Sequence, residues 1–258
     1  MMATDEVIRP ETQPFAPQGG ELVKRHSIVT RIWHWINVLT VLIMLMSGLM
    51  IFNAHPRLYW GEFGANPDKA WLEIPETNGV AFPGWVTIPS TYSLADARLW
   101  HLAFAWVLAL GLLFYLIWGL VRGHIIRDLH IRIAEWKPSH IWQDFKEHAA
   151  LRFPTGAAAL NYNVLQKLAY CGVLFVLLPL IILTGLTMSP NLNAGLTVLL
   201  DLFGGRQSAR SLHFIAAFGL VGFFLVHITM VILAGPINEL RSMITGWYRL
   251  PRDKGEAA

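Results

Sequence analysis

Four long apolar segments dominate the sequence and limit the folds that the chain can adopt. They run approximately over residues 32–52, 99–121, 165–188 and 212–234. Crossing about 30 Å of hydrocarbon takes roughly 20 helical residues, so each segment is long enough to span a membrane. Because lipid offers the backbone no hydrogen-bonding partners, each segment is predicted to be an α-helix. We therefore predict an all-α integral membrane protein in which four helices form a bundle.

The composition agrees with a membrane protein and excludes some kinds of site. Hydrophobic residues make up 54% of the 258 residues and charged residues only 14%. The first twenty residues are polar, so no cleavable signal peptide is expected. The single cysteine, Cys171, lies within an apolar segment. This chain alone can therefore form neither a disulfide nor a cysteine-bound iron–sulfur cluster.

The positions of Lys and Arg predict the orientation of the helices. Basic residues precede the first helix, crowd the second connection and follow the fourth helix, whereas the first and third connections carry few. Because cytoplasmic loops are enriched in Lys and Arg, both termini are predicted to lie in the cytoplasm, with the bundle in a bacterial inner membrane. The expected organisation is a flexible tail over residues 1–23, a transmembrane domain over residues 24–249 and a C-terminal tail over residues 250–258.

The first connection, residues 53–98, is long and rich in Trp, Pro and Gly. One interpretation is a loop that lies on the membrane interface, where Trp is common. The other is a docking surface for a periplasmic partner, because long ordered loops are usually functional. The sequence alone leaves both interpretations open.

Four of the ten histidines lie within the apolar segments, where an ionisable side chain is costly and often functional. They are His34, His101, His213 and His227. Any one of them alone could be a hydrogen-bonded interior residue or could lie near a helix end. The arrangement of the four favours a ligand role.

Two of these histidines, His213 and His227, are fourteen residues apart on one helix. At 100° and 1.5 Å per residue they lie within about 40° of the same face and about 21 Å apart along the axis. In the predicted topology His213 shares its depth with His101 near the periplasm, and His227 shares its depth with His34 near the cytoplasm. Facing imidazoles between helices suit the axial positions of a six-coordinate haem iron. The sequence therefore predicts two b haems, with these four histidines as iron ligands.

Two glycines occupy offsets that fit this arrangement. Gly48 follows His34 by fourteen residues, and Gly119 follows His101 by eighteen. Each glycine is therefore predicted to lie on nearly the same face as its histidine but at the depth of the other haem. A flat macrocycle needs a missing side chain where it passes a helix, although ordinary helix–helix contact also uses Gly.

On these motifs the chain resembles the bacterial di-haem cytochrome b subunits of membrane-bound formate dehydrogenase, thiosulfate reductase and Ni-Fe hydrogenase. The matching residues are Arg31-Ile-Trp-His34-Trp35, Arg98-Leu-Trp-His101, and His213 with His227. The resemblance covers residues 24–249 and implies the same pairing of the histidines. It also implies electron exchange between the quinone pool and a periplasmic oxidoreductase subunit of a molybdenum or Ni-Fe type.

A further stretch, Tyr162-Asn163-Val-Leu-Gln166-Lys167, is similar to a segment near the quinone site of formate dehydrogenase subunits, with Leu165 where that family has Gly. The resemblance implies that Asn163, Gln166 and Lys167 bind quinone at the cytoplasmic start of the third helix. The alternative is that these residues cap and anchor the helix at the interface.

Two other functions remain open on the sequence. The chain could be a self-contained quinone-linked cytochrome b that oxidises a small diffusible reductant. It could also be a transporter with polar histidines in its interior. The four apolar segments contain no Asp or Glu, which argues against transport of protons or cations. No site for chemistry on a polar substrate is evident, so that chemistry is expected in a partner chain.

Overall fold

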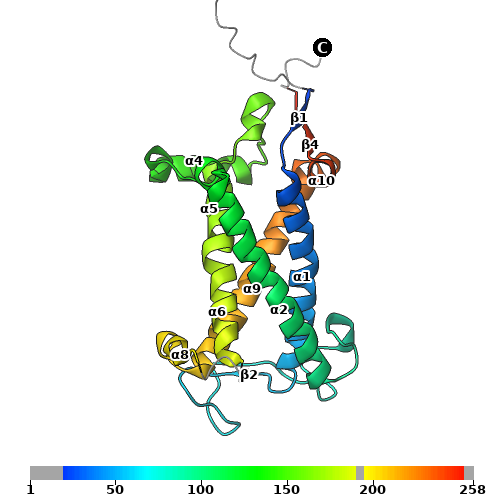
Figure 1. Cartoon of the computed structure of the whole chain (residues 1–258), viewed down its shortest axis with the longest axis vertical. Helices are drawn as coiled ribbons and strands as arrows, with labels where there is room; N and C mark the ends of the chain where they lie inside the picture. Colours follow the sequence, from blue (N-terminus) through cyan, green and yellow to red (C-terminus); the bar gives the residue numbers. More distant parts are fainter. Residues whose placement is uncertain (1–19, 190–194, 253–258) are drawn as a thin grey trace, which may run out of the picture.

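Four long helices form the body of the protein in the computed structural model, which describes residues 20–189 and 195–252 (Figure 1). The first two spans are α1 (Ile28–Phe52) and α2 (Leu94–Val121). The third combines α5 (Val164–Gly172), the π-helical segment η4 (Val173–Leu177) and α6 (Leu178–Met188), and the fourth is α9 (Arg206–Ala234). All four are long and apolar enough to cross a membrane. The predicted all-α membrane bundle is confirmed.

The helices begin earlier than the apolar segments do, because serines cap them in the interfacial region. Ser27 accepts a hydrogen bond from the backbone N–H of Thr30 at 3.1 Å and begins α1. Ser93 accepts one from the N–H of Asp96 at 3.3 Å and begins α2. Caps satisfy backbone donors at a helix start. Hydropathy therefore located the part of each helix in hydrocarbon, and capping set the helix start.

The third span contains a π-helical turn immediately before a proline. Pro179 lacks an N–H, and its ring would clash with the carbonyl of Phe175 in a regular α-helix. The π-helical segment η4 lies over that carbonyl. A π turn widens the helix locally, so the span passes Pro179 without ending.

The four spans associate as two helical pairs. α1 packs along α2, and α6 packs along α9, whereas contacts between the two pairs are far fewer. Between the pairs, a buried apolar cluster joins α2, the third span and α9; it contains Leu112, Tyr115, Leu178 and Leu220 among others. Trp33 of α1 packs on this cluster and stacks on Tyr115, with ring centroids 3.9 Å apart. The two helical pairs therefore meet through a limited core.

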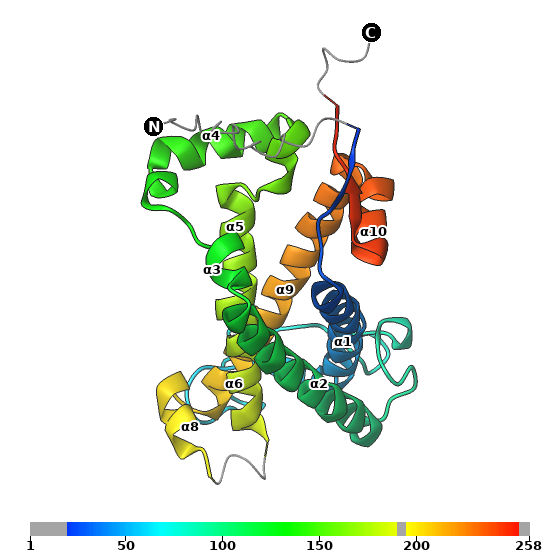
Figure 2. The ribbon, with the colours of Figure 1, turned by 45° about the horizontal axis from the view of Figure 1, so that its top comes forward.

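Short elements decorate both ends of the bundle (Figures 1 and 2). The end at which residues 20 and 252 lie, here the terminal end, carries β1 (Leu22–Lys24), α3 (His124–Asp128), η2 (Ile133–Trp136), α4 (Pro138–Ala149), η3 (Gly156–Leu160), α10 (Pro236–Thr245) and β4 (Trp247–Arg249). The opposite end, here the loop end, carries β2 (Arg57–Leu58), β3 (Leu72–Glu73), η1 (Gly84–Val86) and α8 (Thr197–Phe203). The predicted tails, residues 1–23 and 250–258, lie largely outside the described residues.

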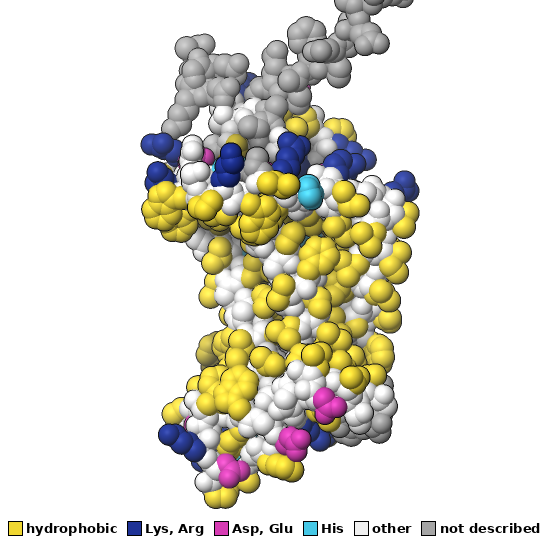
Figure 3. Space-filling view, turned by 90° about the vertical axis from the view of Figure 1, so that its left-hand side faces the viewer, with side chains coloured by type: hydrophobic (Ala, Val, Ile, Leu, Met, Phe, Trp, Pro, Cys, Tyr) yellow, Lys and Arg dark blue, Asp and Glu magenta, His cyan; other side chains and the backbone are white. Residues whose placement is uncertain are grey.

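The surface of the bundle is divided into bands. Apolar side chains cover its middle, Lys and Arg gather at the terminal end, and acidic side chains appear at the loop end (Figure 3). An apolar band between two charged ends is the pattern of a multi-pass membrane protein.

The first connection is ordered and fastened to the start of α9. The backbone N–H of Gly61 donates to Ser208 Oγ at 2.7 Å, and Trp71 Nε1 donates to Ser211 Oγ at 2.9 Å. Gly205 approaches so closely that a Cβ there would lie 2.6 Å from the carbonyl oxygen of Gly61, and its φ is +101°. Only glycine fits this position without strain. The first connection thus forms a fixed cap over the loop end of α9.

The terminal end is closed by a clasp between the two ends of the chain, which consists of β1, β4 and α10. β1 and β4 pair as antiparallel strands. Arg25 lies 3.4 Å from Glu239 of α10 and sits over the ring of Tyr248. Trp35 Nε1 donates to the carbonyl of Met243 at 3.1 Å. The clasp therefore joins the start of α1 to the segment that follows α9.

Candidate functional site

The structure brings the four membrane histidines together as two pairs. At the loop end His101 of α2 faces His213 of α9, with ring centroids 6.2 Å apart and planes crossing at 58°. At the terminal end His34 of α1 faces His227 of α9, with centroids 6.3 Å apart and planes crossing at 57°. We call these the loop-end pair and the terminal-end pair. α9 contributes one histidine to each pair because fourteen residues return a helix to nearly the same face.

The spacing within each pair suits one metal ion between two imidazoles. A nitrogen–metal bond of about 2 Å on each side, with about 1 Å from nitrogen to ring centre, places the two centroids roughly 6 Å apart. No group of three or more His, Cys, Asp or Glu side chains in residues 20–189 and 195–252 could hold a metal ion. Each pair therefore offers two axial ligands and leaves the equatorial positions to another donor. The four ring nitrogens of a haem satisfy that need.

Hydroxyl groups contact both imidazoles of the loop-end pair. Ser47 Oγ of α1 lies 3.1 Å from His101 Nδ1, and Thr184 Oγ1 of α6 lies 3.1 Å from His213 Nδ1. Ser47 and Thr184 are fully buried. Each imidazole thus contacts a hydroxyl of the neighbouring helix in its pair: α1 for His101 of α2, and α6 for His213 of α9.

Glycines lie against the same two rings. A Cβ on Gly48 would lie 3.3 Å from His101 Cε1, and a Cβ on Gly185 would lie 3.4 Å from His213 Cε1. A larger side chain at either position would press on the ring. The loop-end pair therefore lies between two dipeptides of small residues, Ser47-Gly48 and Thr184-Gly185.

The terminal-end pair has a different environment. His34 Nδ1 is buried and has no hydrogen-bond partner among the residues that the structure describes. Its ring meets Trp35 edge-on at 5.1 Å, and the ring of His227 stacks on Phe223 at 5.8 Å. Aromatic packing rather than hydrogen bonding therefore surrounds this pair.

The two predicted glycines have different neighbours. Gly48 lies beside His101, at the depth that its offset from His34 predicts. Gly119 is packed under Ile125 of α3, whose side chain would lie 2.8 Å from an added Cβ. The structure does not bring Gly119 against a histidine ring. Contact of either glycine with a haem stays a prediction.

Arginines precede three of the four histidines by three residues, about one helical turn. These are Arg31 before His34, Arg98 before His101 and Arg210 before His213. Arg31 donates to the carbonyl of Ile244 at 2.9 Å, and its Nε is buried without a partner. Arg210 donates to the backbone carbonyls of His55 and Arg57 in the first connection.

No carboxylate in the described ranges pairs with Arg31 or Arg210. A partly buried positive charge without a carboxylate partner therefore lies near each histidine pair, since the two arginines precede His34 and His213. Such charges suit the propionates of a haem, which are anionic. The donor set and its surroundings thus fit the group.

The three predicted quinone ligands all have partners within the protein. Asn163 caps α5: its Oδ1 accepts from the N–H of Gln166 at 2.9 Å, and Gln166 Oε1 accepts from the N–H of Asn163 at 3.2 Å. Lys167 Nζ lies 2.8 Å from Glu135 Oε1. Hydrogen bonding to Lys167 holds the pKa of Glu135 below its ordinary value. Gln166 and Lys167 therefore have structural roles at the helix start.

Of these three residues, Asn163 lines a pocket. The pocket has a volume of about 330 Å³ and also includes His148, Arg152, Phe153 and Tyr162. Asn163 Nδ2 lies 3.1 Å from His148 Nε2. Burial raises the pKa of Tyr162, so its phenol is neutral at ordinary pH. The pocket combines hydrogen-bonding side chains, the charged residues Asp144, Glu147 and Arg152, and an aromatic wall.

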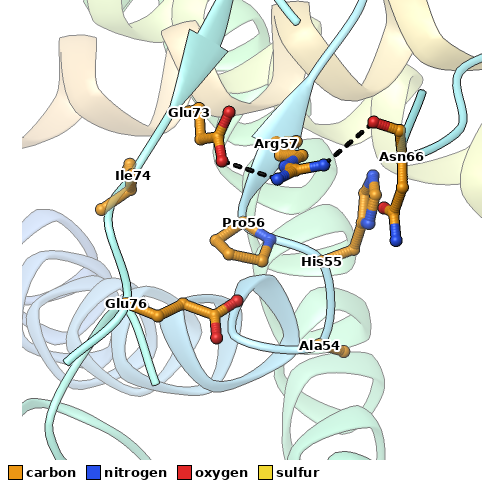
Figure 4. Close-up of a pocket in the computed structure, with 8 residues that line it drawn as sticks. All are labelled: Ala54, His55, Pro56, Arg57, Asn66, Glu73, Ile74 and Glu76. Atoms are coloured by element: carbon orange, nitrogen blue, oxygen red, sulfur yellow. Dashed lines mark hydrogen bonds and ion pairs between the residues drawn. The ribbon is translucent and has the colours of Figure 1, made fainter. Parts of the chain in front are cut away.

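A second pocket, of about 340 Å³, opens in the first connection at the loop end (Figure 4). Arg57 there bonds to Glu73 at 2.7 Å and to the carbonyl of Asn66 at 3.1 Å. Burial, together with the nearby Arg210 and Arg57, lowers the pKa of His55. None of the four membrane histidines lines this pocket.

Sequence reasoning missed the hydroxyl partners of the loop-end pair and the third-span glycine. Ser47, Thr184 and Gly185 lie in apolar segments in which small residues are common. The signal that could have found them is the repeated step of a hydroxyl residue followed by Gly, once in the first span and once in the third.

Comparison with known proteins identifies relatives over nearly the whole chain. The family described as prokaryotic cytochrome b561 matches residues 25–246. A chain from Azospira oryzae, named as the protein-methionine-sulfoxide reductase subunit YedZ1, is 30% identical over 88% of this chain and 98% of its own length. A chain from Azotobacter vinelandii, named as a Ni/Fe-hydrogenase B-type cytochrome subunit, is 24% identical over 92% of this chain and 95% of its own.

A third relative, the Escherichia coli chain named as cytochrome YdhU, is 26% identical over 91% of this chain and 77% of its own length. No solved structure gave a significant match.

Proposed function

The chain belongs to the prokaryotic cytochrome b561 family, and from this premise we propose that it carries electrons across a membrane through two b haems. Family membership implies b-type haem. When bound, a b-type haem would supply one-electron oxidation and reduction. The observation that carries the proposal is the pair of close imidazole contacts at opposite ends of α9.

Each histidine has a stated role in this proposal. His101 and His213 would hold one iron, and His34 and His227 the other. Arg31 and Arg210 would offset the charge of the propionates. The two sites would lie about 21 Å apart along α9. One would lie near each face of the membrane.

The experiment that tests the proposal is a haem count on the purified protein. A pyridine haemochrome assay should give about two b haems per chain and no covalently attached haem. One haem per chain would contradict the pairing of the histidines. An absence of haem would instead favour the transporter that the sequence left open.

The proposed topology places the terminal end in the cytoplasm. The clustering of Lys and Arg at that end supports it (Figure 3). A reporter active only in the periplasm should be silent when fused after Ala258 and active when inserted near Asn78. The reverse pattern would invert the sides of both histidine pairs.

We place the quinone site at the terminal end, in the pocket beside Asn163. Tyr162 lines this pocket and packs on the same apolar cluster as Trp33, the neighbour of His34 in sequence. A quinone exchanges protons with electrons, so it needs hydrogen-bonding groups near water, which Asn163 and His148 provide. Asn163→Leu should slow electron exchange with added quinol while both haem spectra stay intact. Unchanged quinol kinetics in that variant would move the site elsewhere.

The partner is proposed to be a periplasmic oxidoreductase subunit that docks on the first connection. Two relatives carry names of subunits of larger oxidoreductases. The fixed cap exposes large aromatic side chains, including Phe63 and Trp85, which are 84% and 80% exposed. Co-purification of a periplasmic subunit with the chain should depend on these residues. A self-contained quinone-linked cytochrome would purify alone and reduce its haems with a small reductant.

A further inference from the structure

Ser47 and Thr184 contact the loop-end imidazoles in the same way from two different helical pairs. We propose that these two hydroxyls fix the tautomer of His101 and His213 and lower the reduction potential of the haem at the loop end. The inference rests on the proposed function, since it concerns the haem that this pair would hold. It adds Ser47 and Thr184 as positioning residues, because they would act through the imidazoles.

The number of hydrogens on each hydroxyl determines which group donates in the Ser47–His101 and Thr184–His213 contacts. A hydroxyl has one hydrogen to donate. Ser47 Oγ donates to the carbonyl of Ile43 at 2.7 Å, and Thr184 Oγ1 donates to the carbonyl of Leu180 at 2.6 Å. Each hydroxyl can then only accept from the imidazole. Nδ1 of each ring therefore carries the hydrogen.

The fixed tautomer leaves Nε2 of each ring with a lone pair. In a neutral imidazole one nitrogen donates and the other accepts or binds metal. Since Nδ1 is the donor in His101 and His213, Nε2 is the nitrogen available to iron. The hydroxyls thus prepare both rings for ligation before a haem binds.

Backbone carbonyls support the same assignment. The hydroxyl of Ser47 also lies 3.2 Å from the carbonyl oxygen of Met44, and that of Thr184 lies 3.3 Å from the carbonyl oxygen of Ile181, so each hydroxyl hydrogen has two carbonyl acceptors. Each carbonyl belongs to the residue three positions before the hydroxyl residue. The same local arrangement thus occurs once in α1 and once in α6.

A hydrogen bond donated by Nδ1 changes the electronic character of the ligand. Outer partners of a metal-bound histidine raise its basicity. A more basic imidazole stabilises ferric iron over ferrous iron and so lowers the potential. At the terminal end, by contrast, His34 Nδ1 has no partner. The two haems are therefore expected to differ in potential, with the loop-end haem shifted downward by its hydroxyls.

The test uses the His34→Ala protein, in which only the loop-end haem should remain. In that background Thr184→Val keeps the shape of the side chain and removes the hydroxyl. A spectroelectrochemical titration should show an upward shift of the midpoint potential. Thr184→Ser, which restores the hydroxyl, should return the potential to its starting value. A purely packing role predicts the opposite order, because Ser loses a methyl group that Val keeps.

Thr187→Val is the matched control. Thr187 is also fully buried on α6, but it donates to the carbonyl of Thr184, and no hydrogen bond within residues 20–189 and 195–252 joins it to a histidine. Its replacement should leave the potential unchanged. Ser47→Ala should also shift the potential upward, and the double variant should shift it furthest.

The outcomes separate the inference from the proposed function. The inference would be wrong if the Thr184→Val and Thr184→Ser variants both kept a full loop-end haem with the same midpoint potential as the His34→Ala protein that retains Thr184. The proposed function would still stand. A His34→Ala protein without any haem would overturn the histidine pairing itself, and the inference with it. In the chain with all four histidines, Thr184→Val should move one of the two midpoint potentials and leave the other in place.

Discussion

The loop-end pair and the terminal-end pair share a ring spacing but not an environment. Their centroid distances differ by 0.1 Å, from 6.2 to 6.3 Å, and their planes cross at 58° and 57°. The loop-end rings are held by hydroxyls and glycines of neighbouring spans. The terminal-end rings lie among aromatic side chains beside a clasp of short elements. Helix geometry can therefore set the spacing of the imidazole rings, while neighbouring side chains determine the contacts that hold each ring.

The two ends also differ in the pockets that they carry. At the loop end, the pocket of about 340 Å³ lies within the first connection, which is fastened to α9 through Ser208 and Ser211. At the terminal end, the pocket of about 330 Å³ lies beside the start of the third span and includes the aromatic rings of Phe153 and Tyr162. A pocket with an aromatic wall at the start of a membrane span suits exchange with a small apolar molecule that carries protons.

Removal of single ligands gives the largest expected effect on this comparison. His213→Ala should remove the loop-end haem and His227→Ala the terminal-end haem, because each imidazole serves one iron. Each variant should fall from about two haems per chain to about one in a haemochrome assay. His101→Ala and His34→Ala should match His213→Ala and His227→Ala respectively. The pairing would be wrong if His34→Ala and His213→Ala removed the same haem while His227→Ala spared it.

Replacing Gly185 with a large residue should disturb the loop-end pair alone. In Gly185→Leu the side chain starts 3.4 Å from His213 Cε1 and must extend toward or past the ring. We expect the loop-end haem content to fall by half or more, measured by the same assay. Gly222→Leu is the control, since nothing lies within 4 Å of a Cβ there. Equal haem loss in both variants would mean that general helix disturbance, not pressure on the ring, is responsible.

Opening the clasp should weaken the terminal-end pair by a smaller amount. A chain that ends at Gly246 lacks β4, which pairs with β1 next to α1. The terminal-end haem should then dissociate at a lower temperature than in the full chain, and the loop-end haem at the same temperature. The absorbance of each haem during heating measures the two losses. A chain that ends at Arg252 keeps β4 and serves as the control. Simultaneous loss of both haems in the shorter chain would show that the ends are not independent.

The smallest expected effect concerns the ion pair between Glu135 and Lys167 at the terminal end. Because the pKa of Glu135 is lowered in the folded protein, the pair stabilises fully above the ordinary value of 4.5 and loses its effect as the pH falls through the lowered pKa. Glu135→Gln should cost up to about 1 kcal/mol at neutral pH. Thermal unfolding should show a difference at pH 7 that shrinks as the pH falls below 4.5 and through the lowered pKa of Glu135, with both haem spectra unchanged. A difference that persists at acid pH would assign the effect to packing.

The sequence predicted the spans and the histidine pairing because both follow from regular helix geometry. Hydropathy located the spans, and the fourteen-residue interval between His213 and His227 placed two histidines on nearly the same face. The starts at Ser27 and Ser93 lay outside the apolar segments and depended on capping. The contacts of Ser47 and Thr184 depended on which helices pair, which no single-helix pattern contains. The partner of Lys167, Glu135, likewise depended on a tertiary contact, whereas Gln166 pairs locally with Asn163 in the helix cap.

The clasp at the terminal end also orders events during synthesis. β4 ends at Arg249, so its pairing with β1 must wait until almost the whole chain has left the ribosome. The loop-end pair is complete in sequence once His213 has been made, and its supporting residues lie earlier still. The two ligand pairs therefore mature at different times. All four side chains at the loop-end pair, namely Ser47, His101, Thr184 and His213, precede the last turns of α9, whereas the terminal-end pair needs His227 and lies beside a clasp that needs β4.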